Sequence, residues 1–250
     1  MKHGVKKWIE ISTGQVYEAD SKPSAENSKI KPWTQLAEAK LAAEEAVKKT
    51  GIKTVVLRLA VVYGPGDLTG VMPRLVCGAT YTTGEDKMTF LWTKDLKFHT
   101  VHVKDVAAAI VHASTDNVAP GTYNVVDAND SDQGTIADFI TALFGVETDF
   151  MGAMKSKLAT AVAMKTVAAT ANETHLEPWS ELCKKHNITA TPLTPYLDEE
   201  LLYKNAMALD GTAFGKTGFS CERPKVSLAD IKESVQYWID TGAFPKGLLK

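Results

Sequence analysis

The sequence of 250 residues has no long apolar run, little cysteine and almost no net charge. No run approaches the roughly 18 apolar residues that a membrane-spanning helix needs, and Glu10 interrupts the apolar stretch behind the basic start, so we expect no signal peptide. The three cysteines, Cys77, Cys183 and Cys221, lie far apart without metal-ligand spacing, which indicates free thiols in a reducing, cytoplasmic compartment. A net charge of −2 without charged blocks favours neither nucleic acid nor a membrane surface as a partner.

What is present is an ordinary globular composition, 44% hydrophobic and 23% charged, in a length that suits one large domain or two small ones. Residues 8–12 alternate in polarity as a strand does, and residues 33–50 carry apolar residues at helical spacing between Pro32 and Gly51. Residues 54–62 form a near-continuous apolar run, which is typical of a strand buried on both faces. Strand, helix and strand in this order predict a βαβ unit.

The rest of the chain continues the α/β pattern. A capping box at Thr135–Asp138 predicts the start of a helix. The other predicted elements are strands at 98–103 and 121–126 and helices at 104–116, 151–171 and 227–241. We find no internal repeat and no flexible linker, so two domains would be interleaved along the chain.

Five short motifs follow one another in order. They lie at 12–17, 39–44, 62–67, 100–107 and 121–125. Together they resemble the extended short-chain dehydrogenase/reductase superfamily, meaning the NAD-dependent epimerase/dehydratase and 3β-hydroxysteroid dehydrogenase-like proteins. The resemblance implies the C-terminal half of a Rossmann-type parallel sheet with an interleaved smaller substrate-type region.

On this resemblance we expect a partial Rossmann-type sheet over residues 1–66 and a substrate-type mixed α/β region over 67–250, from which 98–126 returns to the sheet. The chain resembles the superfamily from its fifth strand onward, so roughly 100 residues with the glycine-rich cofactor turn are expected to be missing. One glycine-containing stretch, 64–70, follows a strand. We interpret it as a structural turn, because Pro65 removes an amide that a phosphate cradle would use.

The resemblance also implies a catalytic group made of a Ser or Thr, a Tyr, and a Lys four residues after the Tyr. Thr13 matches the first position and Lys40 the last, but Leu36 stands where the Tyr belongs. The chemistry needs the phenol and the ammonium together, because a phenol of pKa about 10 is a poor base until a neighbouring cation stabilises its anion. Lys40 and Tyr63 are the expected cofactor-binding residues. NAD or NADP is implied, although we expect this chain alone not to bind it.

Structural roles remain open for the same residues. Thr13 is also explained as the end of a strand, and Lys40 as a solvated helix residue with Glu44 four positions later. Asp105 is expected to be a helix N-terminal charge rather than a catalytic base. The six histidines show no zinc spacing, so no metal site is predicted.

Two functions from different classes follow. Leu36 and the missing cofactor half favour a structural or interaction subunit without dehydrogenase activity, a pseudoenzyme. Because half of a parallel sheet exposes an edge, such a subunit needs a protein partner or copies of itself. The retained Thr13 and Lys40 favour the alternative, an NAD(P)-dependent oxidoreductase or epimerase acting on a nucleotide sugar or a hydroxysteroid-like substrate, of which this chain is a fragment. Val61 stands where many members carry Asn, which weighs against the nucleotide sugar.

Overall fold

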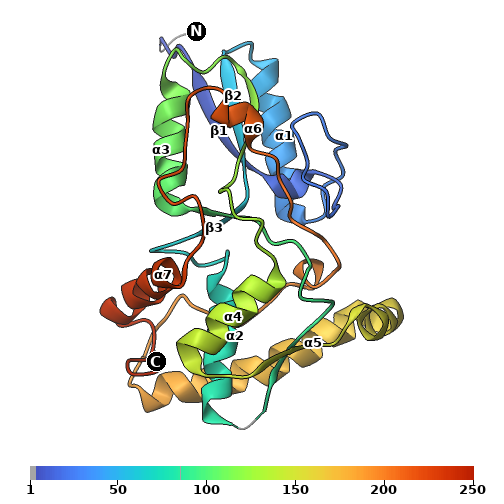
Figure 1. The fold of residues 1–250 in the computed structure, drawn as a ribbon, viewed down its shortest axis with the longest axis vertical. Coiled ribbons are helices and arrows are strands. Elements are labelled where there is room, and N and C mark those ends of the chain that lie inside the picture. The colour runs from blue at the N-terminus through green and yellow to red at the C-terminus, as the bar shows by residue number, and fades with distance from the viewer. Residues whose placement is uncertain (1–3, 85) are drawn as a thin grey trace. The chain divides into compact units, whose positions relative to one another are not determined.

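The computed structural model describes residues 4–84 and 86–250, and the chain divides into two compact units (Figure 1). Unit 1 contains the described residues up to Val62, Lys97–Asp130 and Asn205–Val226. Unit 2 contains the described residues of Tyr63–Leu96, Ser131–Lys204 and Ser227–Lys250. Each unit is therefore assembled from three separate stretches of the chain.

A three-stranded parallel sheet forms the centre of unit 1. Its strands are β1 (Trp8–Thr13), β2 (Thr54–Leu59) and β6 (Gly121–Val125), in the order β1-β2-β6. Every residue of β2 is buried, as expected for an apolar strand covered on both faces. The predicted α/β class with a parallel sheet is thereby confirmed.

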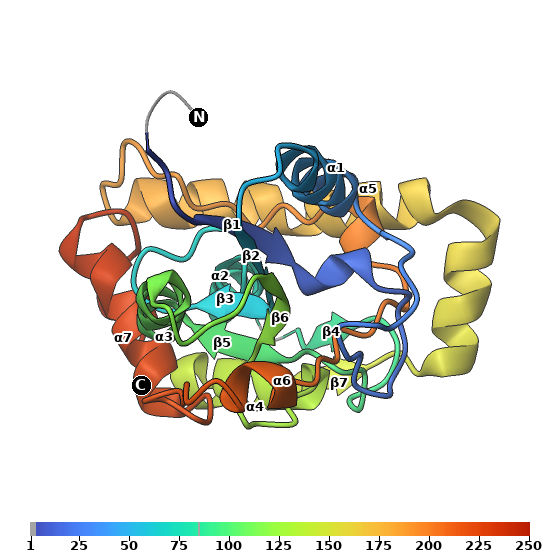
Figure 2. The same cartoon turned by 90° about the horizontal axis from the view of Figure 1, so that it is seen from above.

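Helices cover both faces of this sheet. Helix α1 (Gln35–Lys49) lies on one face, and α3 (Val103–Ser114) and the short α6 (Thr212–Gly215) lie on the other (Figure 2). The helix predicted at 33–50 begins two residues later than expected, because Thr34 is its N-cap.

The apolar run that was predicted as one strand is two strands. The amide of Ala60 still donates to a carbonyl of β6, but the next amide, that of Val61, donates to the carbonyl of His99. The chain thus changes its pairing partner, and β3 (Val61–Tyr63) pairs with β5 (Thr100–His102). Periodicity alone does not reveal such a step, because both strands are apolar.

Unit 2 is mainly helical. Its main elements are α2 (Met72–Thr80), η2 (Tyr81–Thr83), β4 (Met88–Phe90), α4 (Gln133–Phe144), β7 (Thr148–Phe150), α5 (Ala153–Lys185), η3 (Glu199–Leu201) and α7 (Leu228–Asp240). Strands β4 and β7 pair in parallel. Aromatic rings pack together in its core. The ring centroids of Phe144 and Phe244 are 6.2 Å apart, and those of Trp179 and Phe244 are 5.7 Å apart.

Two helices of unit 2 differ from the prediction. Asp132, not Thr135, is the N-cap of α4: its Oδ1 accepts from the Thr135 amide at 2.9 Å, and the Thr135 side chain completes the capping box. Helix α5 was expected to end at 171 but runs on through Pro178. A proline removes one backbone donor, and packing sustains the helix beyond it, since Trp179 is buried and its indole nitrogen donates to Leu193 O at 3.2 Å.

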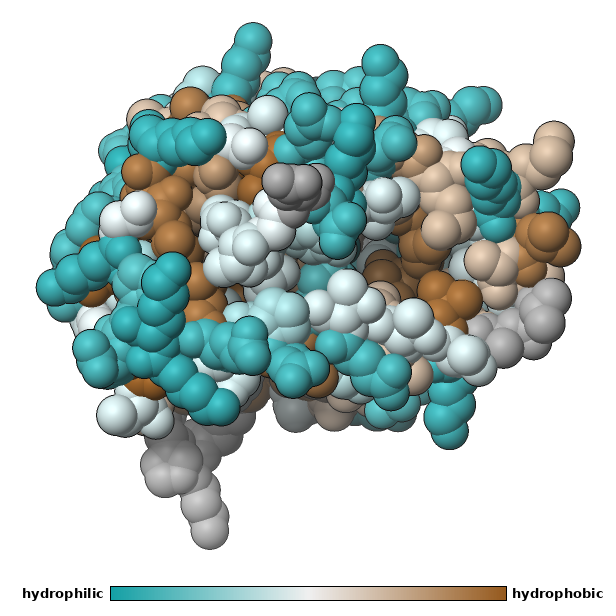
Figure 3. Space-filling model, turned by 90° about the horizontal axis from the view of Figure 1, so that it is seen from below, coloured by the Kyte–Doolittle hydropathy of each residue, from teal (hydrophilic) through white to brown (hydrophobic). Residues whose placement is uncertain are grey.

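Among the described residues, no helix combines the length and the apolarity needed to cross a bilayer. Exposed apolar side chains do occur, for example Met154 and Leu158 in the first turns of α5. In the view from below, apolar residues (brown) stand among hydrophilic ones (teal) (Figure 3).

Residues 205–226 were predicted to lie in the substrate-type region but belong to unit 1, and we call them the returning segment. Met207 exchanges backbone hydrogen bonds with Lys97 and His99. Leu209 is buried against Gly14, where an added Cβ would come within 2.7 Å of its Cδ1. Pairing between segments more than 100 residues apart leaves no local sequence signal.

Candidate functional site

Thr13 ends β1 and caps the short η1 turn (Gly14–Val16). Its Oγ1 accepts a hydrogen bond from the Gln15 amide at 3.2 Å, and its side chain makes no other hydrogen bond within the described part of the chain. A hydroxyl donates one hydrogen bond and accepts two. The hydroxyl proton of Thr13 is therefore available to a ligand.

The start of α1 is fastened next to Thr13. The Thr34 hydroxyl donates to Gln15 Oε1 at 2.7 Å and accepts from the Ala37 amide at 3.0 Å. The amide of Trp33 donates to Gln15 O at 3.3 Å. The structure thus brings the first turns of the helix to the end of the strand, as the candidate catalytic group requires.

Lys40 lies in the second turn of α1 and is half-buried. Its ammonium makes no hydrogen bond or ion pair to any described residue. Leu36, four residues earlier and so on the same helix face, is 58% exposed. The position that the superfamily gives to a phenol therefore presents an apolar side chain, while the ammonium beside it has no partner among those residues. We refer to Thr13 and Lys40 as the candidate site.

Tyr17 is the phenol nearest to Thr13 along the chain, and it is not free to replace the missing one. It is buried, and its hydroxyl donates to Asn124 Oδ1 at 2.8 Å. Burial raises the pKa of Tyr17, although the Arg58 guanidinium, 4.8 Å from its ring centre, works in the opposite direction. A phenol with a raised pKa is a poor base near neutral pH.

Tyr63, the other expected cofactor residue, is fully buried at the end of β3 and belongs to unit 2. Its assignment to the cofactor stays a prediction.

A buried ion pair joins α1 to the sheet beside Thr13. Glu44, one turn after Lys40, holds Arg58 through Nε–Oε1 and Nη2–Oε2 contacts of 3.0 and 2.7 Å. The Ser12 hydroxyl donates to the same Oε1 at 2.5 Å. Burial alone would raise the pKa of Glu44, but the hydrogen bonds from Arg58 and Ser12 hold that pKa below its ordinary value.

The ion pair belongs to a polar row across the sheet, made of Ser12, Arg58 and Asn124. These three are register partners on β1, β2 and β6. The Asn124 side-chain amide donates to Ser24 O at 2.8 Å and to Asp210 O at 3.0 Å. The row was not predicted from the sequence. An arginine inside an apolar strand is a signal for it, because a buried guanidinium requires an acidic partner.

The model of the NAD dependent epimerase/dehydratase family matches residues 1–126. The chain belongs to this family. The match covers β1, α1, β2 and β6, which carry both the candidate site and the polar row, and it confirms the resemblance drawn from the motifs.

Solved structures of this kind share the fold. The chain is similar to dTDP-glucose 4,6-dehydratase from Bacillus anthracis in complex with NAD (15% identity, TM-score 0.62, covering 97% of this chain and 64% of that chain). It is also similar to the Thermus thermophilus UDP-glucose 4-epimerase complex with NAD (20%, 0.59, 95% and 65%). A third is UDP-N-acetylglucosamine 4-epimerase from Methanobrevibacter ruminantium M1 in complex with UDP-N-acetylmuramic acid (16%, 0.61, 96% and 65%).

At these identities the likeness shows a common Rossmann-type fold. The chain spans 64–65% of the length of these three structures. A search of curated protein sequences finds no match.

A chain of the epimerase/dehydratase family is expected to bind a nicotinamide dinucleotide. The residues of this chain fit such a cofactor only in part. The hydroxyl of Thr13 and the ammonium of Lys40 suit hydroxyl groups of a ribose or substrate. The turn at 64–70 suits a diphosphate poorly, because the carboxylate of Asp67 already occupies four amides in and just after it. Asp67 Oδ1 accepts from Thr69 N at 3.0 Å and Gly70 N at 2.7 Å, and Oδ2 accepts from Val71 N and Met72 N at 2.8 and 2.9 Å. The interpretation of this stretch as a structural turn is confirmed.

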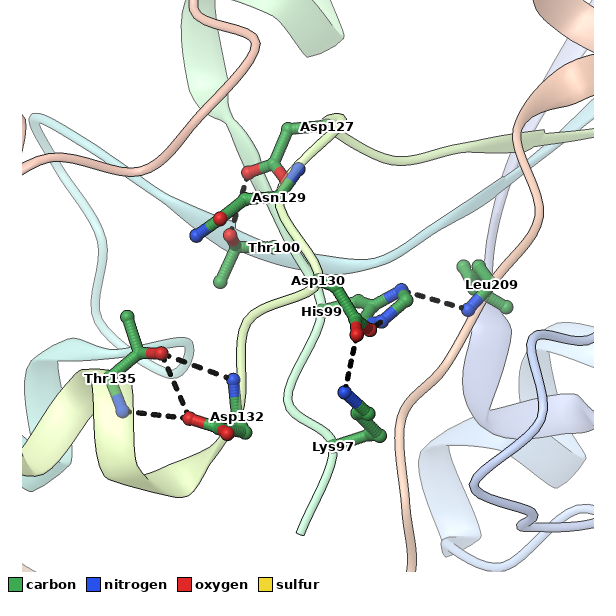
Figure 4. Close-up of polar contacts among 9 residues, drawn as sticks. All are labelled: Lys97, His99, Thr100, Asp127, Asn129, Asp130, Asp132, Thr135 and Leu209. Atoms are coloured by element: carbon green, nitrogen blue, oxygen red, sulfur yellow. Dashed lines mark hydrogen bonds and ion pairs between the residues drawn. The ribbon is translucent and has the colours of Figure 1, made fainter. Parts of the chain in front are cut away.

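Asp127 is a second buried carboxylate, after Glu44, and it holds the loop that follows β6 (Figure 4). Asp127 accepts from the Thr100 hydroxyl at 2.7 Å and from the Asn129 amide at 2.8 Å. Burial raises the pKa of Asp127 to about 6. Both carboxylate oxygens are engaged, so this group has a structural role.

An imidazole attaches the returning segment to the same loop (Figure 4). The amide of Leu209 donates to His99 Nδ1 at 3.1 Å, so the ring proton of the neutral imidazole sits on Nε2, 3.0 Å from Asp130 Oδ1. Lys97 Nζ contacts Asp130 Oδ2 at 2.6 Å. Asp105, expected to be a helix N-terminal charge, lies in the first turn of α3 and accepts from two amides of the returning segment.

Proposed function

We propose that this epimerase/dehydratase-family chain keeps a ligand-facing pair, Thr13 and Lys40, but carries out no dehydrogenase turnover, and that it serves as a structural or interaction subunit. The observation that carries the proposal is Leu36. Removing hydride from an alcohol requires a base for the hydroxyl proton. An isobutyl group accepts no proton, and Tyr17 is buried and committed to Asn124.

The pair can still hold a ligand. The free ammonium of Lys40 and the free hydroxyl proton of Thr13 are donors for ribose or sugar hydroxyls. The carboxylate of Asp67 takes four amides at this turn and places a negative charge there, so the chain would hold only the nicotinamide-ribose end of the cofactor. We therefore expect millimolar rather than micromolar affinity.

The test is direct. The purified 250-residue chain is mixed with NAD or NADP and with UDP-glucose, dTDP-glucose or a 3β-hydroxysteroid, and reduced nicotinamide is followed by its absorbance. We expect no turnover, and no micromolar binding of either dinucleotide by calorimetry. Turnover that disappears in a Lys40→Ala variant would contradict the proposal.

The second candidate is an active NAD(P)-dependent oxidoreductase or epimerase on a nucleotide sugar or a hydroxysteroid-like substrate. It is favoured by Thr13 and Lys40, which match the Ser/Thr and Lys positions of the superfamily and keep donors that no described residue uses. Reading the genomic frame upstream of Met1 separates the two. An upstream glycine-rich strand–turn–helix supports the enzyme, and an in-frame stop codon supports the subunit.

The interaction role rests on β1. This strand is an edge of the sheet, and Trp8 donates its amide to Lys53 O on the β2 side. In a parallel strand the amides alternate in direction, so those of Ile9 and Ile11 point away from the sheet. Trp8, which begins the strand, and Val5, which precedes it along the chain, are 43% and 42% exposed. Among the described residues, no strand pairs with this side of β1. An unpaired, partly apolar edge is a template for a strand of a protein partner or of a second copy.

A further inference from the structure

We propose that Glu44 is a positioning residue of the candidate site: its contacts with Ser12 and Arg58 hold α1 at the register along β1 that keeps Lys40 toward the strand end formed by Thr13. This inference rests on the proposed ligand-binding role of that pair, and it gives a role to a buried acid that the candidate catalytic group leaves out.

The helix and the strand are joined by adjacent residues. Lys40 and Glu44 are one turn apart and share a face of α1. Ser12 and Thr13 are consecutive on β1. Ser12 is the neighbour of Thr13, and Glu44 lies one turn after Lys40. The Ser12–Glu44 hydrogen bond of 2.5 Å therefore links the strand beside Thr13 to the helix turn beside Lys40.

Helix α1 is attached to the rest of unit 1 by two sets of hydrogen bonds, one on either side of Lys40. The Thr34–Gln15 contact of 2.7 Å fixes the start of the helix. The Glu44 contacts fix its third turn. A helix held at one point can still pivot about it, whereas a helix held at two points along its axis cannot slide or rotate independently.

The nature of the second set, made by Glu44, fits positioning better than stability. A buried ion pair costs desolvation, and apolar residues of similar volume often stabilise a core as well or better. Apolar contacts are non-directional. The paired Arg58–Glu44 hydrogen bonds are directional, and Arg58 is itself oriented by the Tyr17 ring below its guanidinium. The ion pair thus fixes an orientation that an apolar contact would leave loose.

The experiment compares Glu44→Gln with Ser12→Ala, which removes only the hydrogen bond to β1 and spares the ion pair in case the first variant does not fold. Glu45→Gln is the matched control, because Glu45 is the next residue of the same helix and is exposed. Ser12→Thr, which keeps the hydroxyl, is the conservative rescue. Peptide-resolved hydrogen exchange of α1 is the first measurement, and amide shift changes at Gly14, Gln15 and Lys40 on titration with millimolar NAD are the second.

We expect Ser12→Ala to speed exchange in α1 and to weaken NAD binding, each about fivefold, as the loss of one hydrogen bond implies, while the melting temperature stays near that of the wild type. Ser12→Thr restores both values, and Glu45→Gln changes neither. Unchanged exchange and unchanged NAD affinity in both Ser12→Ala and a folded Glu44→Gln would overturn the inference. If the amide shifts of the wild type do not change with NAD, the proposed ligand role fails. If, in addition, α1 exchanges in the variants at the same rate as in the wild type, the positioning role fails as well.

Discussion

At the residue scale, three buried polar contacts of unit 1 show side chains matched to partners. Glu44 holds Arg58, Tyr17 donates to Asn124, and Asp127 accepts from Thr100. Such matching is what burial demands, since an unpartnered polar group inside a protein costs stability. Thr13 and Lys40 differ, because each keeps a donor that no described residue uses. That spare capacity, rather than any perturbed acidity, makes them the candidate site.

Replacing Asp127 by Asn should remove a pH dependence of stability. Its pKa is raised to about 6 in the folded chain, above the unfolded value of about 3.9, so the folded state binds the proton more tightly. Its contribution is fully present below about pH 4 and is lost as the pH rises through about 6, by roughly 2–3 kcal/mol. Urea unfolding at pH 4 and pH 7.5 measures this decline. We expect it in the wild type and in Asp116→Asn, an exposed control, and not in Asp127→Asn; an equal decline in all three would refute the assignment.

A methyl group at position 14 should destabilise unit 1. An added Cβ would lie 2.7 and 2.8 Å from the two Cδ atoms of Leu209 and 3.0 Å from the sulfur of Met207. Both side chains are buried, so relief requires movement in a packed core, which costs about 1–3 kcal/mol. Thermal and urea unfolding of Gly14→Ala measure the loss.

Gly215→Ala is the control for this substitution, because open space surrounds that position. The double variant Gly14→Ala/Leu209→Val should recover part of the loss. If Gly14→Ala is as stable as Gly215→Ala, the close approach of the returning segment is wrong.

At the scale of elements, α1 is the most informative part of the chain. Its composition and its stop at Gly51 predict a helix, and the structure has one there. Its helical tendency does not say where the helix attaches. The Thr34 cap and the Glu44 ion pair decide that, because each links the helix to a residue that lies in or follows β1.

Thr34→Ala should loosen the first turn of α1. The substitution removes the cap to the Ala37 amide and the hydrogen bond to Gln15 together, and a lost N-cap costs about 1 kcal/mol. Hydrogen exchange of the first α1 amides should accelerate several-fold, and weak NAD binding should fall with it. Thr34→Ser keeps both bonds and should behave as the wild type; exchange that is equally fast in both variants would point to the methyl group instead.

At the scale of the whole molecule, neither unit is a continuous segment. Unit 1 depends on residues 205–226, which reach it through His99 and Asn124, and its sheet ends at the open edge of β1. A truncation that removes the last third of the chain would therefore strip contacts from both units, since unit 2 includes the stretch from 227 onward.

The open edge makes self-association or partner binding the expected state of the isolated chain. Light scattering should give a mass above the 27.1 kDa of one chain. Trp8→Lys, which adds a charge at the exposed edge, should lower that mass. Leu158→Lys, at a 71% exposed apolar position of α5 in unit 2, should leave it unchanged. A monodisperse wild type of 27.1 kDa would contradict the edge argument.

The sequence by itself determined several of the local elements and the family. Alternation and apolar runs identified β1, β2 and α1, and the motifs around Thr13 and Lys40 predicted the epimerase/dehydratase kind, because these signals lie within short windows. The presence of Leu36 where the superfamily has a tyrosine was also evident from the sequence.

Only the tertiary structure decided the rest. The Ser12–Glu44–Arg58 contacts, the change of partner between β2 and β3, and the return of 205–226 to unit 1 join residues far apart along the chain. Helix and strand patterns report which face of an element is apolar. They carry no information about which distant element covers that face, and the candidate site owes its arrangement to that choice.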